Sequence, residues 1–212
     1  MKIGNNEKCE LTKRVKIHTG FRCNLKCRFC YYIDRLTEEN PSTEEVKAQL
    51  NCAANHGIRD VDFSGGEPTI RKDFPDLVSY AKKLGFRNVC VITNGLMLSD
   101  KEYAKKLVGE GLNEILFSIN GHKAEIHDYL AQLLGCFEKT TKAIQNAKRF
   151  GIRLRTNTVI NKLNYRYVPQ MADLLLEFEP AAVNFILFNP WYSTDTQVRE
   201  MTSKYSETVP YI

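Results

Sequence analysis

Residues 88–121 read NVCVITNGLMLSDKEYAKKLVGEGLNEILFSING, and this stretch decides the class of fold. Its two ends, 88–93 and 114–119, are short runs rich in β-branched and aromatic residues, which is typical of strands. Between them, Ser99 to Glu102 has the spacing of a capping box, which predicts the start of a helix. A helix that joins two apolar strands indicates a parallel pair with a right-handed crossover.

The same alternation continues on both sides of this unit. Further strands are predicted at 14–19, 61–64, 152–160 and 182–188, and further helices at 42–57, 73–84, 137–150 and 165–178. An eight-unit closed barrel needs about 250 residues, whereas this chain has 212. We therefore expect an α/β fold, a partial (open) six-stranded parallel (β/α)6 barrel that is TIM-barrel-like. A doubly wound open sheet is the alternative.

Length and composition indicate one globular domain with short ends. The chain is 43% hydrophobic and 26% charged, which is enough apolar material for a real core. We divide it into an N-terminal segment (1–13), a core domain (14–190) and a polar tail or the start of a missing extension (191–212). Within the tail, a short helix is predicted with Val198, Met201 and Tyr205 on one face.

Charge and hydropathy exclude several classes of partner. A formal charge of +5 is compatible with anionic substrates but too weak to indicate nucleic acid. No run approaches the roughly 18 apolar residues of a membrane span, and the first residues lack the apolar centre of a signal peptide. We therefore expect a cytoplasmic protein without a membrane partner.

Seven cysteines in a reducing compartment favour metal ligands or buried thiols over disulfides. Three of them, Cys23, Cys27 and Cys30, follow the first strand at spacings of four and three. Such a loop can supply thiolates to three irons of a cubane cluster and leave the fourth iron without a protein ligand. An open coordination position of this kind can accept a substrate or a cofactor.

The cysteine spacing resembles the radical S-adenosylmethionine (SAM) superfamily, whose CxxxCxxC signature has an aromatic residue before the last cysteine, here Phe29. Four further motifs carry the resemblance, each at or near the end of a predicted strand: Gly65-Gly-Glu-Pro68, Thr93-Asn-Gly95, Ser118-Ile-Asn-Gly121 and Arg155-Thr-Asn-Thr158. The branch with molybdopterin-precursor cyclases and peptide-maturing enzymes is the most similar. Its members usually carry a C-terminal extension with further cysteines, and this chain has no cysteine after Cys136. Either a small enzyme or the core of a larger one is therefore expected.

The resemblance implies a role for each matching residue. Cys23, Cys27 and Cys30 would ligate a [4Fe-4S] cluster, whose open iron would bind SAM. The residues expected to contact SAM are Phe29, Gly65, Gly66, Glu67, Pro68, Thr93, Ser118, Asn120, Arg155, Asn157 and Asn189. Among them, Gly65 and Gly66 would let the backbone approach the ligand. Glu67 would receive the methionine ammonium, and Arg155 would meet the carboxylate.

The roles of the remaining residues are also implied by the resemblance. Thr93 and Ser118 would bond the methionine or ribose moiety, while Phe29, with residues near Val159 and Asn189, would flank adenine. Asn120 departs from the aspartate of many relatives, so a polar contact there would lack a charge.

The implied reaction is reductive cleavage of SAM to methionine and a 5′-deoxyadenosyl radical, which takes hydrogen from a substrate. Peptide or protein modification is favoured over small-molecule cofactor biosynthesis. A flavodoxin- or ferredoxin-type reductase is the expected partner, because Arg22, Lys26, Arg28 and Arg35 make the cysteine loop positive. A solvated basic loop would have the same composition.

Two other interpretations of the cysteines stay open. A structural zinc site could use His18 as a nominal fourth ligand, although zinc modules normally pair two CxxC knuckles. A non-enzymatic iron–sulfur electron-transfer or sensing protein would bind a cluster and ignore SAM. Thr93, Ser118 and Arg155, taken singly, are also common as caps, strand-end hydroxyls or surface charges.

Overall fold

The fold is an open arc of six parallel strands, described by a computed structural model for residues 13–211. The strands are β1 (Arg14–His18), β2 (Asp60–Ser64), β3 (Asn88–Thr93), β4 (Glu114–Ser118), β5 (Arg153–Ile160) and β6 (Ala182–Leu187). They neighbour one another in chain order, and every pair is parallel. Because this order never reverses, the sheet has no topological switch point, and the doubly wound alternative is wrong. The predicted partial barrel is confirmed.

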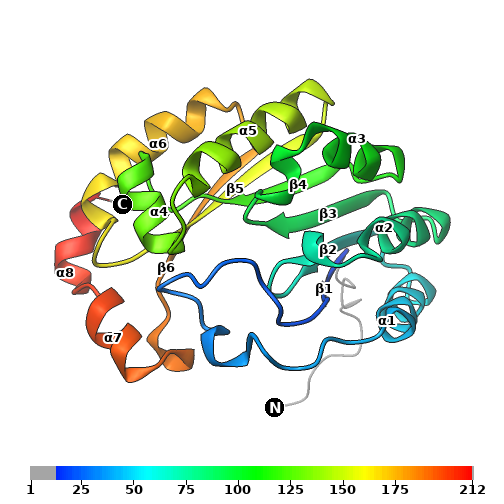
Figure 1. Ribbon diagram of the computed structural model, residues 1–212, viewed down its shortest axis with the longest axis horizontal. Helices are drawn as coiled ribbons and strands as arrows, with labels where there is room; N and C mark the ends of the chain where they lie inside the picture. Colours follow the sequence, from blue (N-terminus) through cyan, green and yellow to red (C-terminus); the bar gives the residue numbers. More distant parts are fainter. Residues whose placement is uncertain (1–12, 212) are drawn as a thin grey trace, which may run out of the picture.

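Helices connect the strands and follow the last one. Their bounds are α1 (Thr43–Asn55), α2 (Phe74–Lys83), α3 (Lys101–Gly109), α4 (Ala124–Ala131), α5 (Cys136–Arg149), α6 (Val168–Glu177), α7 (Asp195–Met201) and α8 (Tyr205–Thr208). In Figure 1, α1, α2, α3, α5 and α6 lie along the outside of the arc, while the segment between β1 and α1, drawn in blue, crosses its open side. Within residues 13–211, no helix has the length and apolar character needed to span a membrane.

Two helix starts show how local chemistry sets the boundaries. The capping box predicted for α1 is confirmed: Glu45 N donates to Ser42 Oγ at 3.2 Å, and Ser42 N donates to Glu45 Oε2 at 2.7 Å. The start predicted for α3 at Ser99 is wrong by one residue, because Asp100 is the cap. Its carboxylate accepts from the first free N–H groups of the helix, including Tyr103 N at 3.1 Å.

The structure tests the predictions for the C-terminal end of the chain and not those for the N-terminal end. Residues 1–12, and Cys9 with them, lie outside the described part of the chain. The predicted tail helix divides into α7 and α8, so Met201 is buried whereas Tyr205 is exposed. A second capping box, in which Gln197 N donates to Thr194 Oγ1 at 3.2 Å, begins α7.

The two faces of the sheet have different chemistry because side chains alternate along each strand. The outer face packs against the helices and forms the apolar core, with Val61, Phe63, Leu77 and Phe117 fully buried. The inner face mixes polar and apolar side chains, and both Ser64 and Leu116 line a cavity there. The core therefore stabilises the arc from outside and leaves the inside free to bind ligands.

A network of ion pairs crosses the inner face below that cavity. Arg14 reaches Glu114 at 2.9 Å and also contacts Asp62, while Arg155 reaches Asp62 at 3.3 Å and contacts Glu114 as well. These side chains come from four strands, β1, β2, β4 and β5. The network ties the strands together across the hollow of the arc, where no apolar core is present.

Candidate active site

One cavity of about 560 Å³ opens at the carboxyl ends of the strands. Its walls come from the cysteine loop (residues 20–32), from the segments after β2, β3 and β4, and from β5 and β6. Of the fourteen residues predicted for the site, twelve line it: Cys23, Cys27, Phe29, Cys30, Gly65, Gly66, Glu67, Thr93, Ser118, Asn120, Asn157 and Asn189. The fold therefore brings together motifs that are far apart in the sequence.

The cysteine loop is held in place by two distant segments. Arg28 N donates to Leu130 O, in α4, at 2.9 Å. From α7, the buried Gln197 donates through Nε2 to Arg28 O at 3.0 Å and to Cys30 O at 2.9 Å. The loop that carries the thiols is thus fixed by a helix near the end of the described chain.

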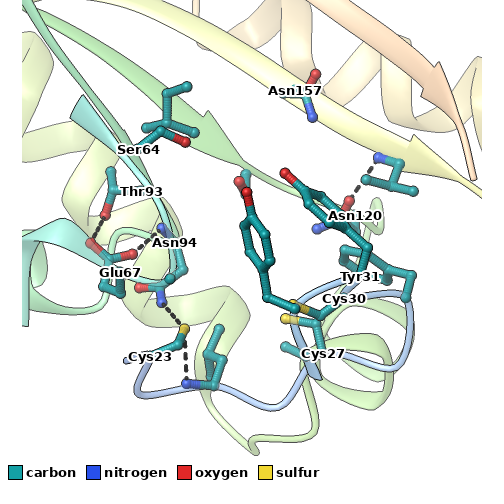
Figure 2. Close-up of a pocket in the computed structure, with 18 of the residues that line it drawn as sticks. Cys23, Cys27, Cys30, Tyr31, Ser64, Glu67, Thr93, Asn94, Asn120 and Asn157 are labelled. Carbon is teal, nitrogen blue, oxygen red and sulfur yellow. Dashed lines mark hydrogen bonds between the residues drawn. The ribbon is translucent and has the colours of Figure 1, made fainter. Parts of the chain in front are cut away.

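The three thiols have the donor chemistry that an iron–sulfur cluster requires. Figure 2 shows the side chains of Cys23, Cys27 and Cys30 on the cysteine loop, along the lower edge of the cavity in this view, which is its mouth. Burial raises the pKa of the Cys23 thiol to about 12 and raises those of Cys27 and Cys30 as well. A bound metal group would have to displace these protons, which couples its binding to proton release.

The zinc interpretation is not supported by the geometry. His18 lies between aromatic rings, with centroid distances of 4.5 Å to Phe21 and 5.2 Å to Tyr32, and it does not line the cavity. Within residues 13–211, no three His, Cys, Asp or Glu side chains are close enough together to hold a single metal ion. A cluster of four irons holds its thiolates farther apart than one ion does, so the three cysteines fit the cluster better.

Cys136, in a buried cluster against which Cys23 and Cys27 pack, is a candidate for a fourth thiol ligand, but it does not line the cavity. It is fully buried and packs with Leu25 and Ala131 behind Cys27. Its Sγ lies 3.4 Å from His127 Nε2. Because the Cys136 side chain does not line the cavity, Cys23, Cys27 and Cys30 are the cysteines that line it within residues 13–211, and their role as ligands stays a prediction.

The two glycines after β2 allow the cysteine loop and the Gly65–Pro68 turn to pack backbone against backbone. Gly66 N donates to Gly20 O at 2.7 Å. A Cβ atom on Gly66 would lie 2.2 Å from Arg22 O, which is far closer than real contacts. The close approach seen here is therefore between two loops, and it sets the position of the first cysteine relative to Glu67.

Glu67 is a buried carboxylate surrounded by donors. Thr69 N donates to it at 3.1 Å, Thr93 Oγ1 at 2.8 Å and Asn94 N at 2.8 Å. Its exposed fraction is 3%, and this burial raises the pKa of Glu67, opposed by the hydrogen bonds. Figure 2 shows the Thr93 and Asn94 contacts at one end of the cavity. Thr93 thus positions Glu67 in addition to lining the cavity.

Asn120 and His127 shape the opposite wall. Asn120 N donates to His127 Nδ1 at 3.1 Å, and Val159 N donates to Asn120 Oδ1 at 2.8 Å. Burial lowers the pKa of His127 to about 4, so the imidazole is neutral at pH 7. Since Nδ1 accepts a hydrogen bond, Nε2 carries the proton and donates to Cys136. This histidine holds the turn after β4 through its contact with Asn120.

Pro68 and Arg155 are the two predicted residues that do not line the cavity. Pro68 is buried at the start of a short turn of helix. Arg155 belongs to the ion-pair network with Asp62 and Glu114. Its contact with the SAM carboxylate stays a prediction, and any such contact competes with these ion pairs.

Several residues at or beside the cavity were not identified by sequence reasoning, among them Asn94, Lys16 and Gln197. Asn94 lies within the quoted Thr93–Gly95 motif, and its Nδ2 is 4.0 Å from Cys23 Sγ. Lys16 lines the cavity from β1. Gln197 bonds the cysteine loop from 167 to 169 positions away, and no local pattern predicts such a contact.

An open α/β half-barrel whose cavity is lined by three thiols from one loop is typical of an enzyme that holds a metal cluster beside a ligand. The chain belongs to the radical SAM superfamily, whose sequence pattern matches residues 17–175. Membership implies SAM and an iron–sulfur cluster as cofactors.

The chain is similar to proteins with several activities. It is 41% identical, over 74% of its length, to Fe-coproporphyrin III synthase of Methanosarcina barkeri, and 32% identical, over 83%, to a probable GTP 3',8-cyclase of Sulfolobus acidocaldarius. It spans 39% and 56% of the lengths of these relatives. Among solved structures, SuiB of Streptococcus suis with S-adenosylmethionine matches 91% of this chain and 44% of its own, with a TM-score of 0.73 and 21% identity. SuiB shows the shared fold alone.

Proposed function

We propose that Cys23, Cys27 and Cys30 hold a [4Fe-4S] cluster and that SAM binds beside it at the mouth of the cavity. When bound, the cluster supplies the electron that cleaves SAM to methionine and a 5′-deoxyadenosyl radical, which takes a hydrogen atom from the substrate. The observation that carries this proposal is the convergence of all three cysteines and nine of the eleven predicted SAM residues on one cavity.

The protein residues contribute positioning and charge. Glu67, fixed by Thr93 and Asn94, would accept the ammonium of the methionine moiety at the cysteine end of the cavity. Leu116, Val159 and other apolar side chains line the remaining wall. Such a wall limits water near a reactive radical.

For the substrate, we propose a small organic molecule. The relatives with 41% and 32% identity carry names of enzymes that make a tetrapyrrole and cyclise a nucleotide, and a cavity of about 560 Å³ has the size of a small-molecule site. A peptide is the second candidate. Ile186 and Leu187 line the cavity and are 49% and 47% exposed, so the site reaches the surface along β6, where a longer chain could leave it.

The test is anaerobic reconstitution with iron and sulfide, followed by dithionite and SAM, with 5′-deoxyadenosine as the measured product. Cys27→Ala should lose both the cluster and the product. Cys52→Ala is the matched control, because this cysteine is exposed on α1, away from the cavity. A fully loaded cluster that yields no 5′-deoxyadenosine, and whose electron paramagnetic resonance spectrum SAM does not change, would favour the electron-transfer or sensing alternative.

We also propose an acidic flavodoxin-like reductase as electron donor, docking on the cysteine loop. Arg28 pairs with Glu200 at 3.6 Å, and Arg35 pairs with Glu38 at 2.7 Å. Arg22 and Lys26 are exposed and form no ion pair within the described chain. Charge reversal at Arg22 and Lys26 should slow flavodoxin-driven SAM cleavage and leave the dithionite-driven reaction unchanged. Equal rates with flavodoxin would remove the docking proposal.

A further inference from the structure

Lys16 lies on the inner face of β1 and lines the cavity. Its register partner on β2 is Asp62, two residues before Ser64 at the carboxyl end of that strand. Lys16 therefore lies deeper in the arc than Glu67 and the cysteine loop. Of the predicted SAM residues, Arg155 reaches this depth, where it pairs with Asp62. The side chain is exposed to the hollow of the arc rather than packed in the core.

The carboxylates nearest in register to Lys16 are already neutralised by arginines. Asp62 is held by Arg14 and Arg155, and Glu114 by the same two guanidinium groups. Asp60 is the register partner of Arg14 and lies two residues farther from the cavity than Asp62. Its carboxylate is 3.9 Å from the Arg14 guanidinium.

Lys16 itself forms no ion pair within residues 13–211. The network around it thus leaves one ammonium group on the cavity wall without a carboxylate.

The rest of the cavity offers no competing cation. Among the described residues that line it, Lys16 is the only lysine or arginine, and His127 is neutral at pH 7 because burial lowers its pKa to about 4. The one acidic lining residue, Glu67, is enclosed by its own hydrogen-bond donors. The Lys16 ammonium is therefore the one cationic group among the described lining residues that could pair with a negatively charged ligand inside the arc.

We propose that Lys16 binds an anionic oxygen group, a carboxylate or a phosphate, of the small-molecule substrate. This inference rests on the proposed function, because it names the chemical class of substrate that the same cavity takes. Lys16 fixes the orientation of that substrate from the floor of the site, so that the atom that loses hydrogen faces the mouth. A charge-assisted hydrogen bond of this kind changes affinity by about ten- to a hundredfold.

The first experiment uses cluster-loaded protein with SAM and three probes of similar shape: phenylacetate, phenyl phosphate and the neutral phenylacetamide. Amine acetylation is followed residue by residue with mass spectrometry. The anions should slow acetylation of Lys16, and phenylacetamide should not. Lys105, exposed on α3 outside the cavity, is the internal control and should react at one rate in all samples.

The second experiment measures probe affinity by calorimetry in variants. Lys16→Met should weaken binding of the anions by about tenfold or more and remove their advantage over phenylacetamide, while Lys16→Arg should retain that advantage. Lys105→Met should behave like the unchanged protein. Protection by only one anion supports the proposal and narrows the substrate to that group.

Two results would overturn the inference: Lys16 acetylated equally fast with and without both anions, or an anion preference that survives in Lys16→Met. The acetylation experiment needs no variant, so a failure of Lys16→Met to fold leaves the inference testable. Failure of the proposed function has a different signature, since it appears as a loaded cluster without 5′-deoxyadenosine whatever the probes do.

Discussion

Gly66→Ala is the substitution that most directly tests how the cysteine loop is positioned. The added Cβ would lie 2.2 Å from Arg22 O and 2.4 Å from Phe21 O, and both neighbours are backbone atoms. Contacts under 3.0 Å are essentially never seen for a real Cβ. A backbone neighbour cannot rotate away as a side chain can, so one of the two loops has to move.

The expected cost follows from what that movement breaks. Overpacking costs about 1–3 kcal/mol. The displacement also strains two hydrogen bonds, Gly66 N to Gly20 O at 2.7 Å and Glu67 N to Arg22 O at 2.9 Å, each worth about 1 kcal/mol. The sum is about 3–5 kcal/mol of unfolding free energy. At about 2–4 °C per kcal/mol for a chain of this size, Tm should fall by about 6–20 °C.

The assay is thermal unfolding of the protein without cluster, together with iron content after reconstitution. Gly66→Ala should lower both, because the loop that moves carries the cysteines. Gly109→Ala is the matched control: its Cβ would meet no atom within 4 Å, and its φ is not in the left-handed region, so it should be neutral or stabilising by up to about 1 kcal/mol. Unchanged Tm and iron content in Gly66→Ala would refute the loop-packing argument.

Three further substitutions test other parts of the molecule. His127 has a pKa lowered to about 4 from 6.5, so about 3 kcal/mol of stability present at pH 7 should be lost as the pH falls from 6.5 to 4. Urea unfolding at several pH values should show this loss in the unchanged protein and not in His127→Gln. Glu114→Gln, which leaves two arginines without that carboxylate, should lower the unfolding free energy by about 3–5 kcal/mol; a loss under 1 kcal/mol in urea unfolding contradicts the network. The Cys136→Ser variant should bind as much iron after reconstitution as the unchanged protein, measured by chemical analysis. A lower iron content would show that Cys136 is a ligand.

The fold was predictable because each strand carries its own signal. Predicted runs of four to nine residues, separated by capping signals and glycines, define six strands whose ends the structure moves by at most one residue. The error at α3 has a local cause, since Ser99 and Asp100 are adjacent and both suit a helix cap. Asp100 is the cap because its carboxylate accepts two N–H groups at once.

Most of the predicted residues that line the cavity belong to contiguous motifs, and Asn189 is the exception. Cysteine spacing and the turn at Gly65–Pro68 are visible locally, whereas Lys16 looks like any exposed lysine until the arc closes around it. Gln197 depends on a contact across 167 or more positions. The ion pairs of Arg14 link residues 48 and 100 positions apart. Contacts of that range are set by register and packing, which a single sequence does not display.

Arg155 shows how the energies of such a network decide a role. Glu114 is 1% exposed, so withdrawing Arg155 toward a ligand would leave a buried charge short of a partner, at a cost of about 3–5 kcal/mol. A new charge-assisted hydrogen bond to a carboxylate returns about 1.5–3 kcal/mol. The first quantity exceeds the second, so Arg155 should stay paired and reach a ligand only through a guanidinium N–H that the network does not use. Lys16 has no such tie within the described chain, and this difference makes it the cation that a substrate can recruit.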